Sequence, residues 1–207
     1  LGADLNVDIG QGTCTMKYNP KINEKLATSS KLTALHPLQP IKTVQGILEI
    51  FYKTDLFLRE ISGLAKFTLQ PASGSQAILT MSSIIKAYHE YNGEGKKRDE
   101  IVTTIFSHPS DAAAPAVQGF KIIDIYPDEN GLPDPEALKE ALSDRTAGLL
   151  ITISADTGIY NPRIKEFTGM IHEIGGLCGY DQANANGILG IARAKEADFD
   201  MSFFNLH

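Results

Sequence analysis

Several polar residues of this chain stand where apolar, strand-like runs give way to turns. Asp181 follows the run Leu177–Tyr180, His108 follows Glu100–Phe106, and His207 comes directly after another apolar run. A carboxylate in such a place could pair with a ring nitrogen of a bound cofactor, and an imidazole could stack on that ring or move protons. Each also has an ordinary explanation, because an aspartate often caps the turn that follows it and a histidine before a proline is often just a loop residue.

A short serine- and glycine-containing turn, Ser73-Gly74-Ser75, is the candidate anion site. It is expected to lie between a strand-like segment, Lys66–Leu69, and a helix that begins near Ser75. Glycine lets the backbone approach a ligand, and the free N–H groups of a helix N-terminus suit a phosphate. The alternative is an ordinary helix cap with serine at the N-cap position. The spacing matches neither a Walker A loop nor a GxGxxG fingerprint.

Two further groups of residues could touch a ligand. Asn184 and Asn186 could supply amide contacts, although asparagine also simply favours turns, and Cys14, Lys17 and Tyr18 near the N-terminus could be reactive. A single cysteine is more often a small apolar filler. The sequence contains no cluster with metal-ligand spacing and no GxSxG elbow, so we expect neither a metal centre nor serine-hydrolase chemistry.

Alternating strand and helix patterns surround these candidates and must position them. Helical patterns cover Thr43–Ser62, Ser75–Tyr88, Ser110–Gln118, Asp134–Leu142 and Arg163–Ile174, and strand patterns cover Glu100–Phe106, Lys121–Tyr126, Ala147–Ser154, Leu177–Asp181 and Met201–Leu206. Continuous apolar strands that alternate with helices predict a three-layer α/β domain with a mixed or mostly parallel sheet. Residues 1–40 are punctuated by glycine and proline and are expected to form an extended arm with one short helix near Lys21–Ser29. Residues 41–207 would then form the domain.

Composition narrows the function classes. Apolar residues make up 43% of the chain, charged residues 21%, and the formal net charge is −6. This acidic balance argues against nucleic-acid or anionic-membrane binding. The sequence also shows no membrane-length apolar run and no signal peptide, and its two cysteines are far apart. We therefore expect a cytoplasmic protein with free thiols.

Several sequence motifs of the chain resemble those of the glycine decarboxylase P protein of the glycine cleavage system, and in particular those of its subunit 2. The motifs that carry the resemblance are GTCTMKYNPK at 12–21, HPLQP at 36–40, VQG at 44–46, LQPA at 69–72, the Asp181–Gly190 segment and FNLH at 204–207. The last of these matches the family's NLHK run, in which the lysine forms the Schiff base with the cofactor. The resemblance spans nearly the whole chain.

The resemblance implies an enzyme of the oxidoreductase class with the fold-type I, aminotransferase-like architecture. It would decarboxylate glycine with pyridoxal 5′-phosphate and pass the aminomethyl group to the lipoyl arm of the H protein. Its partners would include subunit 1 of the P protein, in a hetero- or homo-oligomer. On this resemblance Ser73, Gly74 and Ser75 would hold the cofactor phosphate, with Asn184 as a further cofactor contact.

The resemblance assigns the remaining candidates as well. Asp181 would pair with the pyridinium nitrogen, and His108 would pack near the ring as a catalytic residue together with His207. Cys14, Lys17 and Tyr18 would face the substrate, and the Schiff-base lysine is expected just after His207. With that lysine beyond the recorded chain, we expect an incomplete large domain.

Three segments differ from the corresponding sequence motifs of the family. GSQAI at 74–78 replaces GAHGE, SHPSDAAA at 107–114 keeps the histidine of SAHGTNPA but loses GTN, and ISADTG at 153–158 replaces NPNTLG. Two alternatives therefore stay open. One is a divergent, non-catalytic structural or partner subunit of the same system. The other is a different pyridoxal-phosphate enzyme for a small amino acid, either an aminotransferase or a lyase.

Overall fold

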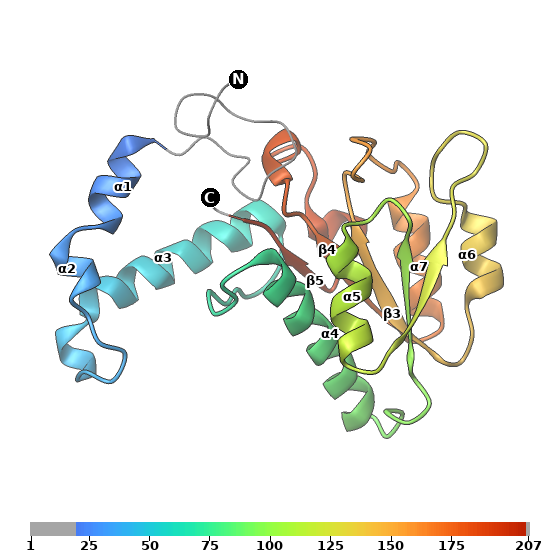
Figure 1. Ribbon diagram of the computed structural model, residues 1–207, viewed down its shortest axis with the longest axis horizontal. Coiled ribbons are helices and arrows are strands. Elements are labelled where there is room, and N and C mark those ends of the chain that lie inside the picture. Colours follow the sequence, from blue (N-terminus) through green and yellow to red (C-terminus); the bar gives the residue numbers. More distant parts are fainter. Residues whose placement is uncertain (1–19, 206–207) are drawn as a thin grey trace. The chain divides into compact units, whose positions relative to one another are not determined.

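The computed structural model describes residues 20–205 (Figure 1), so Cys14, Lys17, Tyr18 and His207 lie outside the described residues. The chain divides by its contacts into two units, with residues 1–58 and 206–207 in the first and Arg59–Asn205 in the second. Each is treated by itself. The division of the chain into an arm and a domain after residue 40 stays a prediction.

The described part of the first unit is helical. It contains α1 (Lys21–Ala27), α2 (Ser30–Thr33), the 3₁₀ turn η1 (Ile41–Thr43) and most of α3 (Gln45–Ser62), whose last turn belongs to the second unit. The short helix expected near Lys21–Ser29 and the helix expected over Thr43–Ser62 are confirmed. The four-residue α2 was not expected, because a single turn carries no periodic signal of its own.

The second unit is built on a five-stranded sheet that is parallel at every pairing. The strand order is β2-β1-β3-β4-β5. The bounds are β1 (Glu100–Thr104), β2 (Lys121–Ile125), β3 (Thr146–Thr152), β4 (Leu177–Asp181) and β5 (Met201–Phe203). Because β2 and β3 lie on opposite sides of β1, the topology reverses between β1 and β3. In such sheets ligands bind outside the carboxyl ends of the strands at this point.

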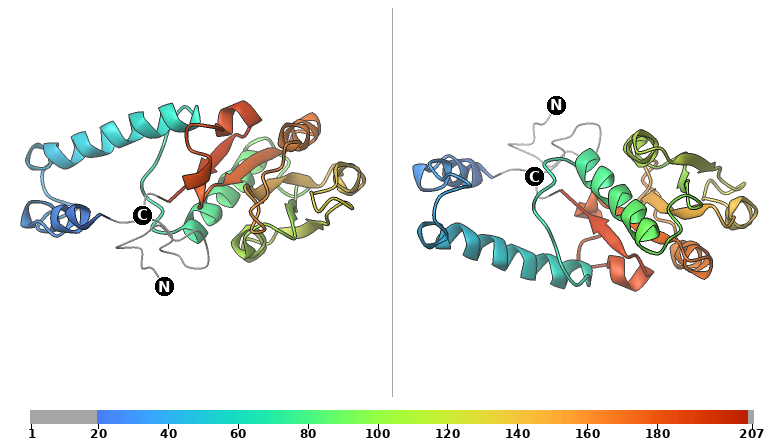
Figure 2. Two further views of the ribbon diagram at one scale, coloured as in Figure 1. Left: turned by 90° about the horizontal axis from the view of Figure 1, so that it is seen from above. Right: turned by 90° about the horizontal axis from the view of Figure 1, so that it is seen from below.

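Helices cover both faces of this sheet (Figures 1 and 2). α4 (Gly74–Tyr91) and α5 (Pro109–Val117) pack on one face, and α6 (Pro135–Ala141) and α7 (Ile164–Glu173) pack on the other. Two apolar cores result, one on each side of the sheet. The core under α4 contains Ile78, Met81, Ile85, Ile101 and Leu150, and the core under α6 and α7 contains Leu138, Leu149, Ile151, Phe167 and Ile171. The predicted three-layer α/β architecture is confirmed.

One strand prediction is wrong. Lys66–Leu69 was expected to form a strand, but it is an irregular connector between α3 and α4. The segment is largely exposed, and its one partly buried apolar residue, Phe67, packs its ring against Phe204 with centroids 6.0 Å apart. A β pattern this short becomes a strand only when a neighbouring strand pairs with it, which a local sequence pattern does not reveal.

Helix α4 lies close to the sheet because glycines stand beneath it. A Cβ built on Gly179 of β4 would lie 2.5 Å from Leu150 Cδ2 and 3.3 Å from Met81 Sδ. At the far end of the helix, the buried His89 places its Nε2 2.8 Å from the carbonyl oxygen of Ala147. These contacts hold α4 against β3 and β4, and its N-terminus therefore lies at the carboxyl edge of the sheet.

Within the described residues, none of the helices combines the length and the apolar character that a bilayer crossing requires.

Candidate functional site

Polar groups from three elements meet at the carboxyl edge where the strand order reverses. Thr152 ends β3, Asp181 ends β4, and the loop after β1 leads through His108 into the first turn of α5, which carries Asp111. Asp111 has none of its surface exposed to solvent and Asp181 only 1%. Parallel strands bring their ends to one edge, so residues far apart in the sequence lie together here.

Hydrogen bonds organise this edge. The Thr152 hydroxyl donates to Asp111 Oδ2 at 2.7 Å and accepts from the backbone N–H of His108 at 2.8 Å. The backbone N–H of Thr152 in turn donates to Ser107 Oγ at 3.1 Å. On the other side, Asp181 accepts from the backbone N–H of Ala183 at 2.8 Å. Among residues 20–205, neither aspartate forms an ion pair with a lysine or an arginine.

Both carboxyl groups are more basic than usual. Burial raises the pKa of Asp111 well above its ordinary range, and the nearby charge of Asp181 raises it further, while the hydrogen bond from Thr152 opposes the shift. Burial also raises the pKa of Asp181, against the hydrogen bond from Ala183 and the attraction of His108. Asp156, on the loop after β3, adds a like charge that raises the pKa of both groups. Two buried acids this close favour losing one charge.

His108 is the N-cap of α5 rather than an unattached loop residue. Its Nδ1 accepts from the backbone N–H of Ser110 at 3.1 Å and lies 2.7 Å from the Ser110 hydroxyl. Because the amide can only donate, Nδ1 is the acceptor and a neutral ring carries its proton on Nε2. The side chain is exposed, so Nε2 and the ring faces stay accessible beside Asp181.

The N-terminus of α4 joins the same edge. The Ser73 hydroxyl caps the helix by accepting from the backbone N–H of Gln76 at 3.2 Å, and Gln76 Oε1 accepts from the backbone N–H of Ala72 at 2.7 Å. The ordinary-cap interpretation of this turn is therefore correct for the Ser73 side chain. An α-helix still offers the first-turn N–H groups, here those of Gly74 and Ser75, to an outside acceptor.

Gly74 links this helix end to the strands. A Cβ at Gly74 would lie 3.2 Å from Phe203 Cε2 and 3.8 Å from Asn205 Oδ1, and Phe203 pairs in register with Asp181. The turn at 73–75, which was predicted to bind an anion, and Asp181, which was predicted to pair with a ring nitrogen, thus both lie next to the end of β5. Asn184 is exposed and occupies the N-cap position of the 3₁₀ turn η2 (Ala185–Gly187), three residues after Asp181, without a side-chain capping hydrogen bond.

Sequence reasoning missed Asp111, Thr152 and Ser107. Asp111 is the third residue of α5, where an acidic side chain normally complements the helix dipole. An acid at this position therefore gives no sign of a functional site. The signal that could have found it is the position of Asp111 in the first helical turn after His108, on the β1–α5 connection that reaches the reversal point.

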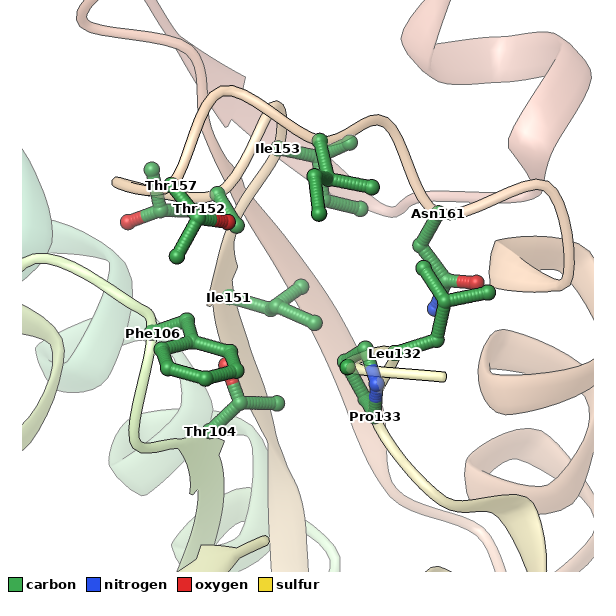
Figure 3. A pocket seen from close by; sticks show the side chains of 12 residues that line it. Thr104, Phe106, Leu132, Pro133, Ile151, Thr152, Ile153, Thr157 and Asn161 are labelled. Carbon is green, nitrogen blue, oxygen red and sulfur yellow. The ribbon is translucent and has the colours of Figure 1, made fainter. Parts of the chain in front are cut away.

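A small hollow lies behind this edge, on the side of the sheet that carries α6 and α7 (Figure 3). Its walls are mainly apolar, with Phe106, Leu132 and Ile151 among them, and Thr104, Thr152 and Asn161 provide polar atoms. No charged side chain lines it. We interpret it as packing space rather than as a ligand site.

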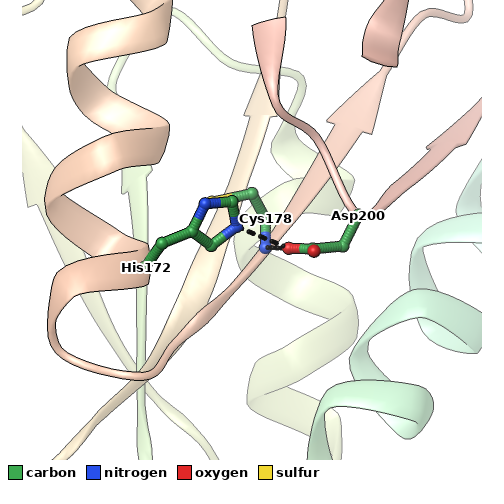
Figure 4. A group of neighbouring side chains, drawn as sticks. All are labelled: His172, Cys178 and Asp200. Atoms are coloured by element: carbon green, nitrogen blue, oxygen red, sulfur yellow. Dashed lines mark hydrogen bonds and ion pairs between the residues drawn. The ribbon is translucent and has the colours of Figure 1, made fainter.

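The residues His172, Cys178 and Asp200 form a polar cluster at the opposite, amino edge of β4 and β5 (Figure 4). Their potential metal-binding atoms lie within 4.8 Å of one another. Asp200 Oδ2 already accepts from the backbone N–H of Cys178 at 2.7 Å and lies 2.9 Å from His172 Nε2. Burial raises the pKa of the Cys178 thiol well above its usual range, which disfavours the thiolate that metals bind. The cluster serves to tie α7 to the sheet.

Comparison with known proteins places this architecture in a family. Residues 79–207 match the family model described as "Aminotransferase class-V". The chain belongs to the class-V aminotransferase family. Class-V aminotransferases are pyridoxal-phosphate-dependent enzymes, and the α/β sandwich described above is their fold-type I domain.

Solved structures and curated relatives agree with that assignment. A structure titled "NIFS-LIKE PROTEIN" superimposes with a TM-score of 0.71 at 14% identity, over 99% of this class-V aminotransferase chain and 54% of that chain. One titled "SspA in complex with cysteine" superimposes with a TM-score of 0.70 at 15% identity, over 90% and 53% of the two chains. At such low identities these structures establish the fold alone.

Two curated relatives carry the same name, "Probable glycine dehydrogenase (decarboxylating) subunit 2". The one from Pyrococcus furiosus is 47% identical over 95% of this chain, and the one from Caldanaerobacter subterraneus subsp. tengcongensis is 46% identical over 99% of it. The class-V aminotransferase chain spans 39% and 42% of the length of these two relatives.

Proposed function

We propose that this chain is the cofactor-binding part of a pyridoxal-phosphate-dependent glycine decarboxylase, subunit 2-like. The observation that carries the proposal is the buried acid Asp181 at the same sheet edge as the α4 N-terminus, in a chain 46–47% identical to proteins named for that activity. When bound, the cofactor would accept the electron pair released as the bond between the α-carbon and the carboxylate of glycine breaks.

The residues present fit this cofactor. Asp181 is a buried carboxylate that has no lysine or arginine partner among residues 20–205, so a cationic ring nitrogen would supply the missing charge. Gly74 lets the N-terminus of α4 lie close to the end of β5, since a side chain there would press on Phe203. We assign the phosphate to the backbone N–H groups of Gly74 and Ser75, with Ser73 shaping the turn.

The other roles follow from position. His108, exposed beside Asp181 and anchored by Ser110, would lie near the ring with its Nε2 free to hold or move a proton, and Asn184 would contact the cofactor from the turn after β4. The lysine expected after His207, the catalytic role of His207 and the substrate-side roles of Cys14, Lys17 and Tyr18 fall outside the described residues. They remain parts of the proposal.

The proposal includes the partners of the whole enzyme. Glycine would be the substrate, the lipoyl arm of an H protein would receive the aminomethyl group, and a subunit 1 would complete the oligomer. The "subunit 2" in the names of the relatives supports a partner subunit.

Cofactor recognition can be tested with pyridoxamine 5′-phosphate, which carries the same ring and phosphate but needs no Schiff-base lysine. We expect it to bind more tightly than pyridoxamine, which lacks the phosphate. We also expect Asp181→Asn to weaken binding by about 10- to 100-fold, because it removes a hydrogen bond between charged groups. Asp124→Asn, which changes an exposed acid of β2 that does not act on Asp181, is the matched control and should have little effect. Equal binding of both compounds would refute the phosphate assignment.

The reaction is tested in a longer version of the protein that continues past His207. Release of CO₂ from glycine that depends on lipoylated H protein is the expected result. A longer version that binds the cofactor, but instead transaminates or remains inactive with subunit 1 and H protein present, would contradict decarboxylation.

A further inference from the structure

The side chain of Asp111 is the one buried acidic group of this edge that the proposed cofactor contacts do not use. Its Oδ2 is satisfied by the Thr152 hydroxyl at 2.7 Å. Its Oδ1 is fully buried and has no hydrogen-bond donor within the described part of the chain. A buried carboxylate oxygen without a donor is destabilising, so this atom requires an explanation.

The neighbour of Asp111 is another carboxyl group. Asp181 pairs in register with Thr152, the residue whose hydroxyl donates to Asp111, and one of its own oxygens already accepts from Ala183. Thr152 cannot serve both acids, because its single hydroxyl proton goes to Asp111 Oδ2 while its oxygen accepts from His108. A proton held between the two carboxyl groups would give Asp111 Oδ1 a donor.

We propose that Asp111 and Asp181 hold one proton between them, and that Asp111 is a positioning residue that sets how much negative charge Asp181 presents to the cofactor ring. The first claim, that the two aspartates share a proton, concerns the chain without cofactor and does not depend on the proposed function. The second claim, that Asp111 controls the charge facing the ring, rests on the proposed function.

The charged groups around the pair determine how it titrates. His108 faces Asp181 from the β1–α5 connection and favours its charged form, whereas Asp156 faces both acids from the loop after β3 and disfavours charge on either. Burial has the larger effect on both aspartates, in the direction that retains the proton. One proton therefore stays on the pair when isolated aspartates have lost theirs.

The test compares the free wild-type chain with Asp111→Asn and Asp181→Asn. An asparagine at 111 can still accept from Thr152, and its amide can donate to Asp181, so the geometry is preserved. Infrared or ¹³C NMR spectra of aspartate-labelled protein at neutral pH should show one protonated carboxyl in the wild type. That signal should be missing from both single variants, since either change leaves a single acid with a donor. A wild type without the signal, or a variant that keeps it, overturns the shared proton.

Stability provides a second readout with a defined sign. The folded pair has raised pKa values, so its contribution to stability is greatest below the unfolded aspartate pKa of about 3.9 and is lost as the pH rises through the folded values. Wherever the folded pair holds one proton more than the unfolded chain, the wild-type folding equilibrium falls by about tenfold per pH unit. The stability of Asp111→Asn relative to wild type should therefore increase between pH 4 and pH 8. Asp124→Asn, which changes an exposed acid of β2 and leaves the pair and its charged neighbours unaltered, should retain a wild-type slope. A pH-independent difference for Asp111→Asn would overturn the proposal.

The effect of Asp111 on the cofactor ring is tested separately, by the titration of the ring nitrogen. In bound pyridoxamine 5′-phosphate, the pH at which the ring nitrogen loses its proton, followed by absorbance, should be higher in Asp111→Asn than in wild type, because Asp181 then no longer shares a proton and carries its full charge. An unchanged midpoint overturns the role toward the ring. A failure of pyridoxamine 5′-phosphate to bind at all refutes the proposed function, while the carboxyl spectra of the free chain still decide the shared proton.

Discussion

Replacement of Gly179 by alanine tests whether the close seating of α4 on the sheet is a real constraint. The added Cβ would lie 2.5 Å from Leu150 Cδ2, and Met81 Sδ and Cε lie 3.3 and 3.4 Å away on the other side. Carbon atoms prefer separations of about 3.5–4.0 Å, so the neighbours must move by roughly 1 Å. Leu150 is fully buried and Met81 is 5% exposed, which leaves little free volume for that movement.

The size of the effect follows from this crowding. Overfilling a packed core costs about 1–3 kcal/mol. For a domain of this size each kcal/mol lowers the melting temperature by about 2–4 °C, so Gly179→Ala should melt about 2–12 °C below the wild type. Because Met81 belongs to α4, the helix end that carries Gly74 should shift as well, and affinity for pyridoxamine 5′-phosphate should fall.

The assay is thermal unfolding followed by circular dichroism, with Gly169→Ala as the matched control. Gly169 lies inside α7, and a Cβ there would meet nothing within 4 Å. Alanine favours the helix by about 1 kcal/mol over glycine, so the control should melt about 2–4 °C above the wild type. If both variants moved in the same direction, the packing argument for Gly179 would be wrong.

Three further predictions concern single contacts. Ser73→Ala removes the N-cap of α4 and should lower the free energy of unfolding by about 1 kcal/mol in denaturant titrations. Ser75→Ala, which changes no cap, should have little effect. Equal losses in the two variants would contradict the capping role of Ser73. His89→Leu leaves the Ala147 carbonyl without its buried partner and should cost about 1–3 kcal/mol in the same titration, and an unchanged midpoint would show that water replaces the imidazole. Cys178 should be unreactive toward a thiol reagent in the folded chain and react only on unfolding, because it is buried and burial raises its pKa; rapid labelling of the folded chain would contradict the structure.

The pattern of apolar residues predicted most of the secondary structure of the second unit, because each helix or strand keeps the same kind of burial along its whole length. The central strands β1, β3 and β4 are buried on both faces, and α4 and α7 show a clear apolar side. Boundaries were less accurate. The strand expected over Glu100–Phe106 ends at Thr104, where the chain turns to reach His108.

The candidate site was predictable only in part. Asp181 and the Ser73–Ser75 turn stand at visible strand and helix ends, so their types and places indicated a ligand edge. The acid pair could not be inferred in that way, because Thr152 and Asp111 are 41 residues apart and Asp181 is farther still along the chain. Their proximity is a property of the strand order, and a single sequence contains no local signal for which strands become neighbours.

The anchoring of α4 at both ends has a consequence for how this chain can vary in length. Gly74 rests against Phe203 at one end, and His89 meets the Ala147 carbonyl at the other. One inserted residue would rotate one half of the helix by about 100° relative to the other and lengthen it by about 1.5 Å. One of the two ends would then lose its contact. Insertions should therefore be excluded from α4.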